Sequence, residues 1–153
     1  MTNFKNKTIA VIGEGIEGLS SAKYFKKHGA DVTVLDQKDD KDYLQALDKY
    51  DLIVRSPGVK PQLLEKHKNV TSQINLFLEL APCKIIGITG TKGKGTTSSL
   101  IYQMLKKQGF DAYWGGNIGV PPFEFLDKLN THCFVILELS SFQLMDVKKS
   151  PNI

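Results

Sequence analysis

Residues 84–97 read KIIGITGTKGKGTT, and this stretch decides how the second half of the chain folds. It begins as a short apolar run rich in β-branched residues, breaks at Gly90 and ends in threonines before an amphipathic segment. That order predicts a strand, a phosphate-binding loop and a helix. In such a loop glycine lets backbone N–H groups turn towards an anion, a lysine reaches the terminal phosphates, and a hydroxyl near the helix start can bind Mg²⁺. We expect the helix to end near Gly109 and to bury one apolar face, made of Leu100, Ile101, Met104 and Leu105.

The loop departs from the common G-x-x-x-x-G-K-[ST] pattern in two places. A loop that ends at Lys94 needs glycine at position 88 and serine or threonine at position 95, but the chain has Ile88 and Gly95. Its own spacing is G-x-x-G-K-x-T, from Gly90 to Thr96. The alternative is a glycine-rich turn whose lysines serve only solubility. We favour the phosphate loop because strand, loop, lysine, hydroxyls and helix occur together in the required order.

A second glycine motif lies near the start of the chain. Residues 8–36 predict a strand, a G-x-G-x-x-G turn, a helix and a second strand that ends at Asp36. The glycines of the turn are Gly13, Gly15 and Gly18, and the apolar face of the helix is Leu19, Ala22 and Phe25. Such a unit can present helix N-terminal amides to a diphosphate, with the acid meeting a ribose or base. Two alternatives stay open: an NAD-binding oxidoreductase or regulatory module, and a tight turn without a ligand.

The segment from position 37 to position 82 completes the first predicted domain. A short helix is expected around Tyr43, Leu44 and Leu47, a strand at 52–54, and helices opening at Pro61 and covering 74–80. The strand runs into Arg55, Ser56, Pro57 and Gly58, a turn at the sheet edge where ligands of open α/β sheets bind; a plain Pro-Gly turn is the alternative. Because a new strand starts directly after Pro82, we expect domains at 1–82 and 83–153.

The second predicted domain brings an acid close to the phosphate loop. Strands are expected at 111–114 and 134–137, with a glycine-rich turn at 115–119 that contains Asn117 and a short helix at 123–129. The last strand ends on Glu138. A carboxylate at the tip of a strand beside a phosphate loop is typical of a Mg²⁺ ligand, whereas without that loop it would be an ordinary solvated side chain. The predicted fold is therefore α/β: a Rossmann-like parallel-sheet domain followed by the first part of a P-loop-type ATP-binding domain.

Composition narrows the function classes. The net charge is +4, but 19 of the 20 basic residues are lysines spread along the chain, with Arg55 the only arginine, so nucleic-acid binding is disfavoured. No apolar run is long enough for a membrane span, and we expect a cytoplasmic protein. Cys83 and Cys133 lack metal-ligand spacing and are expected as buried thiols at strand starts. The three histidines are assigned no chemistry, because capping or exposure accounts for them. The final residues stop in mid-pattern, which suggests a fragment.

Three motifs in this order resemble the Mur ligases, the ATP-dependent enzymes of peptidoglycan precursor synthesis. They are TGTKGKGTT at 89–97, GGNIG at 115–119 and ELSSFQL at 138–144. With the G-x-G-x-x-G turn and SPG ahead of them, the chain is similar to the members of the family that add D-glutamate to UDP-N-acetylmuramoyl-L-alanine. That resemblance implies an ATP- and Mg²⁺-dependent enzyme, monomeric at full length, that acts on these two substrates and has no nucleic-acid or membrane partner.

The resemblance also assigns roles to residues. The first domain would hold UDP rather than NAD, with Gly15, Ile16 and Glu17 along the nucleotide, Asp36 near the uracil or ribose, and Ser56, Pro57 and Gly58 near the diphosphate. ATP would lie on Gly90, Thr91, Lys92, Gly93, Lys94, Gly95, Thr96 and Thr97. Within that loop Lys94 would grip the β- and γ-phosphates, while Thr96 and Glu138 would bind Mg²⁺. The muramoyl end would meet Asn117, Ser140, Ser141 and Gln143.

The same resemblance implies a reaction. The substrate carboxylate would attack the γ-phosphate, and the amine of D-glutamate would open the resulting acyl phosphate to an amide, with Lys94 and Glu138 as the catalytic pair. The family's later metal-binding histidine, carbamoylated lysine and carboxyl-terminal domain have no counterpart before Ile153. We therefore expect residues 1–153 alone to be inactive in ligation.

Overall fold

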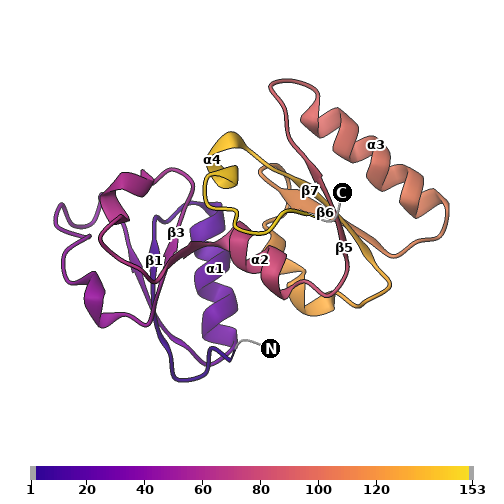
Figure 1. Ribbon diagram of the computed structural model, residues 1–153. Helices are drawn as coiled ribbons and strands as arrows, with labels where there is room; N and C mark the ends of the chain where they lie inside the picture. Colours follow the sequence, from indigo (N-terminus) through magenta and orange to yellow (C-terminus); the bar gives the residue numbers. More distant parts are fainter. Residues whose placement is uncertain (1–2, 152–153) are drawn as a thin grey trace. The chain divides into compact units, whose positions relative to one another are not determined.

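The computed structural model describes residues 3–151, which divide into two compact units after Gln73. Both units are mixed α/β structures with parallel sheets, so the predicted fold class is confirmed (Figure 1). The first unit ends within helix α2 (Gln73–Leu80), nine residues before the domain boundary expected at Pro82. No helix in the described part of the chain is both long and apolar enough to cross a membrane.

The first unit is built on a four-stranded parallel sheet in the order β2-β1-β3-β4. The strands are β1 (Thr8–Ile12), β2 (Asp31–Leu35), β3 (Leu52–Arg55) and β4 (Val70–Ser72). Ile9 of β1 is opposite Val32 on one side and Leu52 on the other. A strand with neighbours on both sides has both faces covered in a parallel sheet, which is why β1 is almost continuously apolar. The core on one face contains Ala10, Ile12, Leu47, Tyr50, Ile53 and Leu64.

Helix α1 (Ile16–Lys27) connects β1 to β2, and it is followed by Gly29, whose φ of 80° suits glycine. Ala22 and Phe25 are buried as predicted, but Leu19 is 53% exposed, so the predicted helix face was wrong there. The physical reason is Gly18, which is buried and packs so closely that a Cβ on it would lie 1.9 Å from the carbonyl oxygen of Gly13. The close-packed face is centred on Gly18, and Leu19 is turned away from it.

The second unit contains a three-stranded parallel sheet in the order β5-β7-β6. The strands are β5 (Lys84–Ile88), β6 (Ala112–Gly116) and β7 (Phe134–Glu138). Helix α3 (Lys94–Lys107) packs with Ile101 and Leu105 on the core of this unit, whereas Leu100 and Met104, predicted on the same face, are 51% and 63% exposed. Among the described residues this sheet has three strands, so it covers a narrower stripe of the helix than the prediction assumed.

Short connections differ most from the prediction. The helix expected around Tyr43 is a series of turns followed by a 3-10 helix, Leu47–Lys49, and the helix expected from residue 123 is two 3-10 helices, Pro122–Glu124 and Leu126–Lys128. Pro61 opens a further 3-10 helix, Pro61–Leu64. Strand β4 was not predicted, because three residues carry too little periodicity to register. Of these segments only β4 takes part in a sheet, where it pairs with β3 at one edge.

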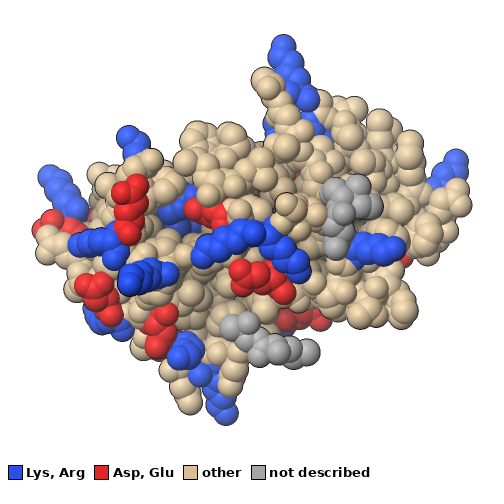
Figure 2. All heavy atoms as spheres, viewed as in Figure 1, with Lys and Arg blue, Asp and Glu red and all other residues tan. Residues whose placement is uncertain are grey.

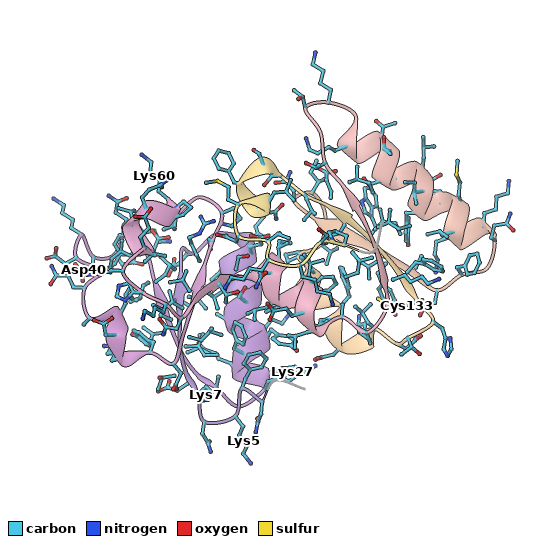
Figure 3. The ribbon with its side chains drawn as sticks, in the orientation of Figure 1. Lys5, Lys7, Lys27, Asp40, Lys60 and Cys133 are labelled. Carbon is cyan, nitrogen blue, oxygen red and sulfur yellow. The ribbon has the colours of Figure 1, made fainter. Side chains whose placement is uncertain are left out.

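Isolated side chains also report on the packing. Cys83 and Cys133 are buried and directly precede β5 and β7, as expected; Figure 3 labels Cys133. Burial raises the pKa of the Cys83 thiol to about 12. His67, expected to be capping or exposed, is buried, and its Nδ1 lies 2.8 Å from Oδ1 of Asp48. On the part of the first unit in view, lysine and acidic side chains alternate (Figure 2).

Candidate functional site

The glycine-rich turn of the first unit leads directly into the N-terminus of α1. Gly13 has φ 99°, and its N–H donates to the carbonyl oxygen of Leu35 at 2.8 Å, which fixes the turn against the end of β2. Gly15 is the N-cap residue and supplies no side-chain cap, and a Cβ on it would meet nothing within 4 Å. At Gly15 the N-terminus of α1 therefore carries no side-chain cap and adjoins open space, as an anion site at a helix N-terminus requires.

The Asp36 side chain is hydrogen-bonded to the glycine-rich turn and stabilises it. Its Oδ2 accepts a hydrogen bond from the Glu14 N–H at 2.8 Å, and its Oδ1 accepts one from the Lys38 N–H at 3.0 Å. These hydrogen bonds, that of Glu14 first, hold the pKa of Asp36 below its ordinary value. A contact between Asp36 and a ribose or base stays a prediction, whereas its contact with the glycine-rich turn is a structural fact.

The Ser-Pro-Gly turn lies beside the glycine-rich turn. The Ser56 N–H donates to the carbonyl oxygen of Ile12 at 2.9 Å, and its Oγ donates to that of Gly13 at 3.3 Å. A Cβ on Gly18 would lie 3.0 Å from Ser56 Oγ. The structure thus brings the predicted substrate residues Gly15, Ser56 and Asp36 to the carboxyl edge of one sheet.

The buried side chain of Arg55 stabilises the Ser-Pro-Gly turn through hydrogen bonds to its carbonyl oxygens. Its side chain is only 2% exposed, and the guanidinium donates hydrogen bonds to the carbonyl oxygens of Ser56 at 3.3 Å, Pro57 at 3.4 Å and Val59. Sequence reasoning counted this residue as the only arginine and gave it no role. Its position in the sequence could have suggested a structural role. A charged residue at the end of an apolar strand and directly before a turn can donate hydrogen bonds to the carbonyl oxygens of that turn.

A second residue that sequence reasoning missed is Gln73. It is 2% exposed, and its Nε2 donates to the carbonyl oxygen of Glu17 at 3.0 Å and to Ser21 Oγ at 2.9 Å. Ser21 in turn donates to the same Glu17 carbonyl at 2.8 Å. Gln73 follows β4 directly, so it fixes the first two turns of α1 to the end of that strand. No motif in the sequence marks it.

In the second unit the predicted phosphate loop joins β5 to α3. Gly90 and Gly93 have φ values of 146° and 80°, a conformation that residues other than glycine rarely adopt. Helix α3 begins at Lys94, whose Nζ donates to the carbonyl oxygen of Gly90 at 2.8 Å, so the side chain folds back over the loop. Thr96 and Thr97 are both exposed at the start of the helix. The loop has the form expected for a phosphate site.

Glu138 is a buried carboxylate at the carboxyl edge of the second sheet, on which the predicted phosphate loop also lies. It is the last residue of β7 and fully buried, which contradicts the alternative of a solvated carboxylate. Asn117 donates to it twice, from N–H to the Glu138 carbonyl at 2.8 Å and from Nδ2 to Oε1 at 3.4 Å. Oε2 accepts no hydrogen bond from any described residue, and a Cβ on Gly95 would lie 3.6 Å from it.

This arrangement fits a divalent cation. Burying a carboxylate oxygen without a partner costs free energy, and a bound hard cation such as Mg²⁺ would offset that cost, with the carboxylate as its ligand. Gly95 brings the first turn of α3 close to Glu138, and Gly116 allows the neighbouring turn to approach, since a Cβ there would lie 2.2 Å from the Glu138 carbonyl oxygen. Lys94, Thr96, Asn117 and Glu138 are thus at one sheet edge.

The residues after Glu138 are used locally. Ser140 and Gln143 form a capping box at α4 (Ser141–Leu144): the Gln143 N–H donates to Ser140 Oγ at 3.2 Å, and the Ser140 N–H donates to Gln143 Oε1 at 2.9 Å. Gln143 is buried and Ser141 is exposed. The box fixes the turn that follows Glu138, while a contact of these residues with substrate stays a prediction.

Comparison with known proteins agrees with both units. Residues 7–71 match the amino-terminal domain of MurD-like Mur ligases, and residues 88–152 match the middle domain of Mur ligases. The chain therefore belongs to the Mur ligase family.

Within that family the chain is similar to a particular set of enzymes. It is 38% identical to a UDP-N-acetylmuramoylalanine–D-glutamate ligase of Acetivibrio thermocellus, 37% to one of Ruminiclostridium cellulolyticum and 36% to one of Clostridium botulinum strain Hall. Each match covers 97% of this chain and 38% of the relative. The chain thus spans well under half the length of these relatives.

Proposed function

We propose that the protein containing this chain is an ATP-dependent ligase that adds D-glutamate to UDP-N-acetylmuramoyl-L-alanine, a step of peptidoglycan precursor synthesis in the cytoplasm. The observation that carries the proposal is the buried Glu138, whose unpartnered Oε2 adjoins the start of α3. A carboxylate at the tip of a strand beside a phosphate loop is typical of the Mg²⁺ ligand in nucleotide-dependent enzymes. The family match and the names of the relatives support the choice of reaction.

The first unit would bind the UDP part of the substrate. Gly15, Ile16 and Glu17 contribute the first-turn amides of α1, which suit a diphosphate, and Ser56, Pro57 and Gly58 adjoin the same turn. Asp36 holds the turn in shape through its two accepted hydrogen bonds. The uracil and ribose would then lie along the edge between β1 and β2.

The second unit would bind ATP on the loop of residues 90–97. Lys94 would exchange its bond with the Gly90 carbonyl for the β- and γ-phosphates, and Thr96 and Glu138 would hold Mg²⁺. When bound, Mg²⁺ neutralises charge on the transferring phosphoryl group. Lys94 would orient the γ-phosphate for attack by the substrate carboxylate, and Asn117 would keep the Glu138 carboxylate turned to this edge.

The steps of the reaction then follow from the substrates. The attack forms an acyl phosphate and releases ADP, and the amine of D-glutamate displaces phosphate to form the amide. In this proposal residues 1–153 contain the binding sites for UDP and for ATP, and we place the D-glutamate site outside them. Ser140, Ser141 and Gln143 would border the muramoyl end, because they follow Glu138 directly.

Calorimetric titration of the 153-residue chain tests the proposal. We expect UDP-N-acetylmuramoyl-L-alanine to bind and NADH not to bind, and Asp36→Ala to weaken the former because the turn loses its brace. ATP with Mg²⁺ should bind independently and should lose most of its affinity in Lys94→Met. Binding of NADH alone would overturn the ligase assignment in favour of a dinucleotide-binding module.

A further inference from the structure

The glycine-rich turn of the first unit carries an acid where an anion is expected. Glu14 stands between Gly13 and Gly15, and its side chain is 31% exposed. The feature that favours a diphosphate here is the N-terminus of α1, which begins at Ile16 directly after Gly15. A carboxylate within a few ångströms of a diphosphate repels it, more strongly near protein than in bulk water. The turn therefore needs a compensating charge.

Lys38 supplies that charge. Its Nζ forms an ion pair with Glu14 Oε2, and this hydrogen-bonded contact raises the pKa of Lys38 above its ordinary value. The backbone favours this ion pair, because the main chain at Glu14 and the main chain at Lys38 are both hydrogen-bonded to the Asp36 carboxylate. Asp36 accepts hydrogen bonds from the N–H groups of Glu14 and of Lys38. The segment after β1 and the segment after β2 are thus locked side by side.

We propose that Lys38 is a positioning residue for the diphosphate of the substrate, acting by holding and neutralising Glu14 at the mouth of the glycine-rich turn. The proposal rests on the function proposed above, since it requires a nucleoside diphosphate on the first unit. It predicts a dependence on ligand charge. Loss of Lys38 should matter most for UDP, less for UMP and not at all for uridine.

The test is a set of titrations of the 153-residue chain with UDP, UMP and uridine. In Lys38→Met, which leaves Glu14 uncompensated, we expect UDP affinity to fall about tenfold and uridine affinity to stay within about twofold. Glu14→Gln combined with Lys38→Met should restore UDP affinity to within about twofold of the unmodified chain. Raising the salt concentration should shrink the defect of the single variant, because exposed charges are screened.

The matched control is Lys7→Met. Lys7 forms another exposed ion pair, with Asp51 at 3.5 Å, and it lies at the opposite end of the first unit from Lys60, which follows the Ser-Pro-Gly turn (Figure 3). This variant should bind all three ligands normally. Thermal denaturation of each variant separates loss of charge from loss of fold.

Three outcomes would overturn the inference. If Lys38→Met binds UDP normally, Lys38 has no such role. If the double variant does not recover, Lys38 acts by direct contact with phosphate rather than through Glu14. An equal loss for uridine and UDP would indicate a merely structural role. Failure of the unmodified chain to bind UDP is a different result, because it removes the proposed function of the first unit and the inference with it.

Discussion

Asn117 is bound to Glu138 at both its backbone and its side chain: its N–H donates to the Glu138 carbonyl at 2.8 Å and its Nδ2 to Oε1 at 3.4 Å. The two residues come from the turn after β6 and from the tip of β7, in adjacent strands. One carboxylate oxygen is occupied by this contact, and the other adjoins Gly95 at the start of α3. Oε2 thus has no hydrogen-bond partner among the described residues, and it is the oxygen that we propose for Mg²⁺.

Stabilisation by nucleotide should depend on the residues at this oxygen. At about 100-fold excess over Kd, a ligand that binds only the folded state stabilises it by about 2.7 kcal/mol, which for a chain of this size raises Tm by roughly 5–10 °C. We expect ATP with Mg²⁺ to produce such a shift in the unmodified chain, and Glu138→Gln and Thr96→Val to lose it. The measurement is differential scanning calorimetry with and without Mg²⁺.

Thr97→Val is the matched control for Thr96→Val, because both threonines are exposed in the first turn of α3. It should keep the shift. If Thr97→Val loses the Mg²⁺-dependent shift and Thr96→Val keeps it, the assignment of the metal-binding hydroxyl moves to Thr97.

The strand–turn–helix units around the two glycine-rich turns, and the acids at the ends of β2 and β7, could be predicted from the sequence. Each predicted motif follows an apolar run, and the carboxyl ends of parallel strands meet at one edge, so Gly13 and Asp36, or Gly95 and Glu138, were expected to lie near each other. Periodicity identified the elements because burial on both faces demands long apolar runs in central strands such as β7.

Helix faces and polar contacts were out of reach for physical reasons. Leu100 and Met104 match a helical face but are exposed, because the width of the sheet under α3 sets how much of the helix is covered. The hydrogen bonds of Gln73 to α1 cross 56 and 52 positions of sequence, and no local pattern encodes such a distance. His67 is buried against Asp48, 19 positions away, for the same reason.

Arg55 should be worth more to stability than any exposed lysine of the chain. Arg55→Met leaves the carbonyl oxygens of the Ser-Pro-Gly turn without their donor, at a cost of about 3 kcal/mol in the free energy of unfolding. Arg55→Lys should lose less but still measurably, because a single ammonium cannot reproduce the planar fork. Urea denaturation measures both.

The comparison variant for Arg55 is Lys60→Met, which removes an exposed cation just after the same turn and should change stability by less than about 0.5 kcal/mol. A loss for Arg55→Met that is no larger than this would show that the turn keeps its shape without the guanidinium.

Two glycines of one motif should respond in opposite ways to a side chain. Gly18→Ala forces a Cβ to within 1.9 Å of the Gly13 carbonyl oxygen, so α1 must shift, and we expect a loss of about 2 kcal/mol. Gly15→Ser meets open space and adds a preferred N-cap, so stability should hold or rise.

The same serine should nevertheless weaken UDP binding, because its hydroxyl would occupy a first-turn amide that the diphosphate needs. Parallel measurements of unfolding and of UDP affinity check both glycines. Unchanged UDP affinity in a Gly15→Ser protein of normal stability would mean that the diphosphate lies elsewhere.

Asp36 should make stability depend on acid. Its pKa is lowered in the folded chain below the ordinary value for aspartate by the hydrogen bonds from the Glu14 and Lys38 amides. A carboxyl group with a lowered folded-state pKa contributes stability that is fully present above its unfolded-state pKa and is lost as pH falls through the folded-state value. Asp36→Asn cannot accept at both oxygens and should lose this contribution at every pH.

The difference in unfolding free energy between the unmodified chain and Asp36→Asn should therefore be constant from neutral pH down to about pH 5 and shrink as the pH approaches about 3. Asp51, whose pKa is lowered chiefly by the Thr8 N–H, should behave alike in Asp51→Asn, although it lies at the opposite end of β1. Denaturation curves that stay parallel across this range would show that the Asp36 carboxylate gains nothing from its two amides. UDP affinity separates the two variants, because only Asp36 braces the glycine-rich turn: Asp36→Asn should weaken it and Asp51→Asn should not.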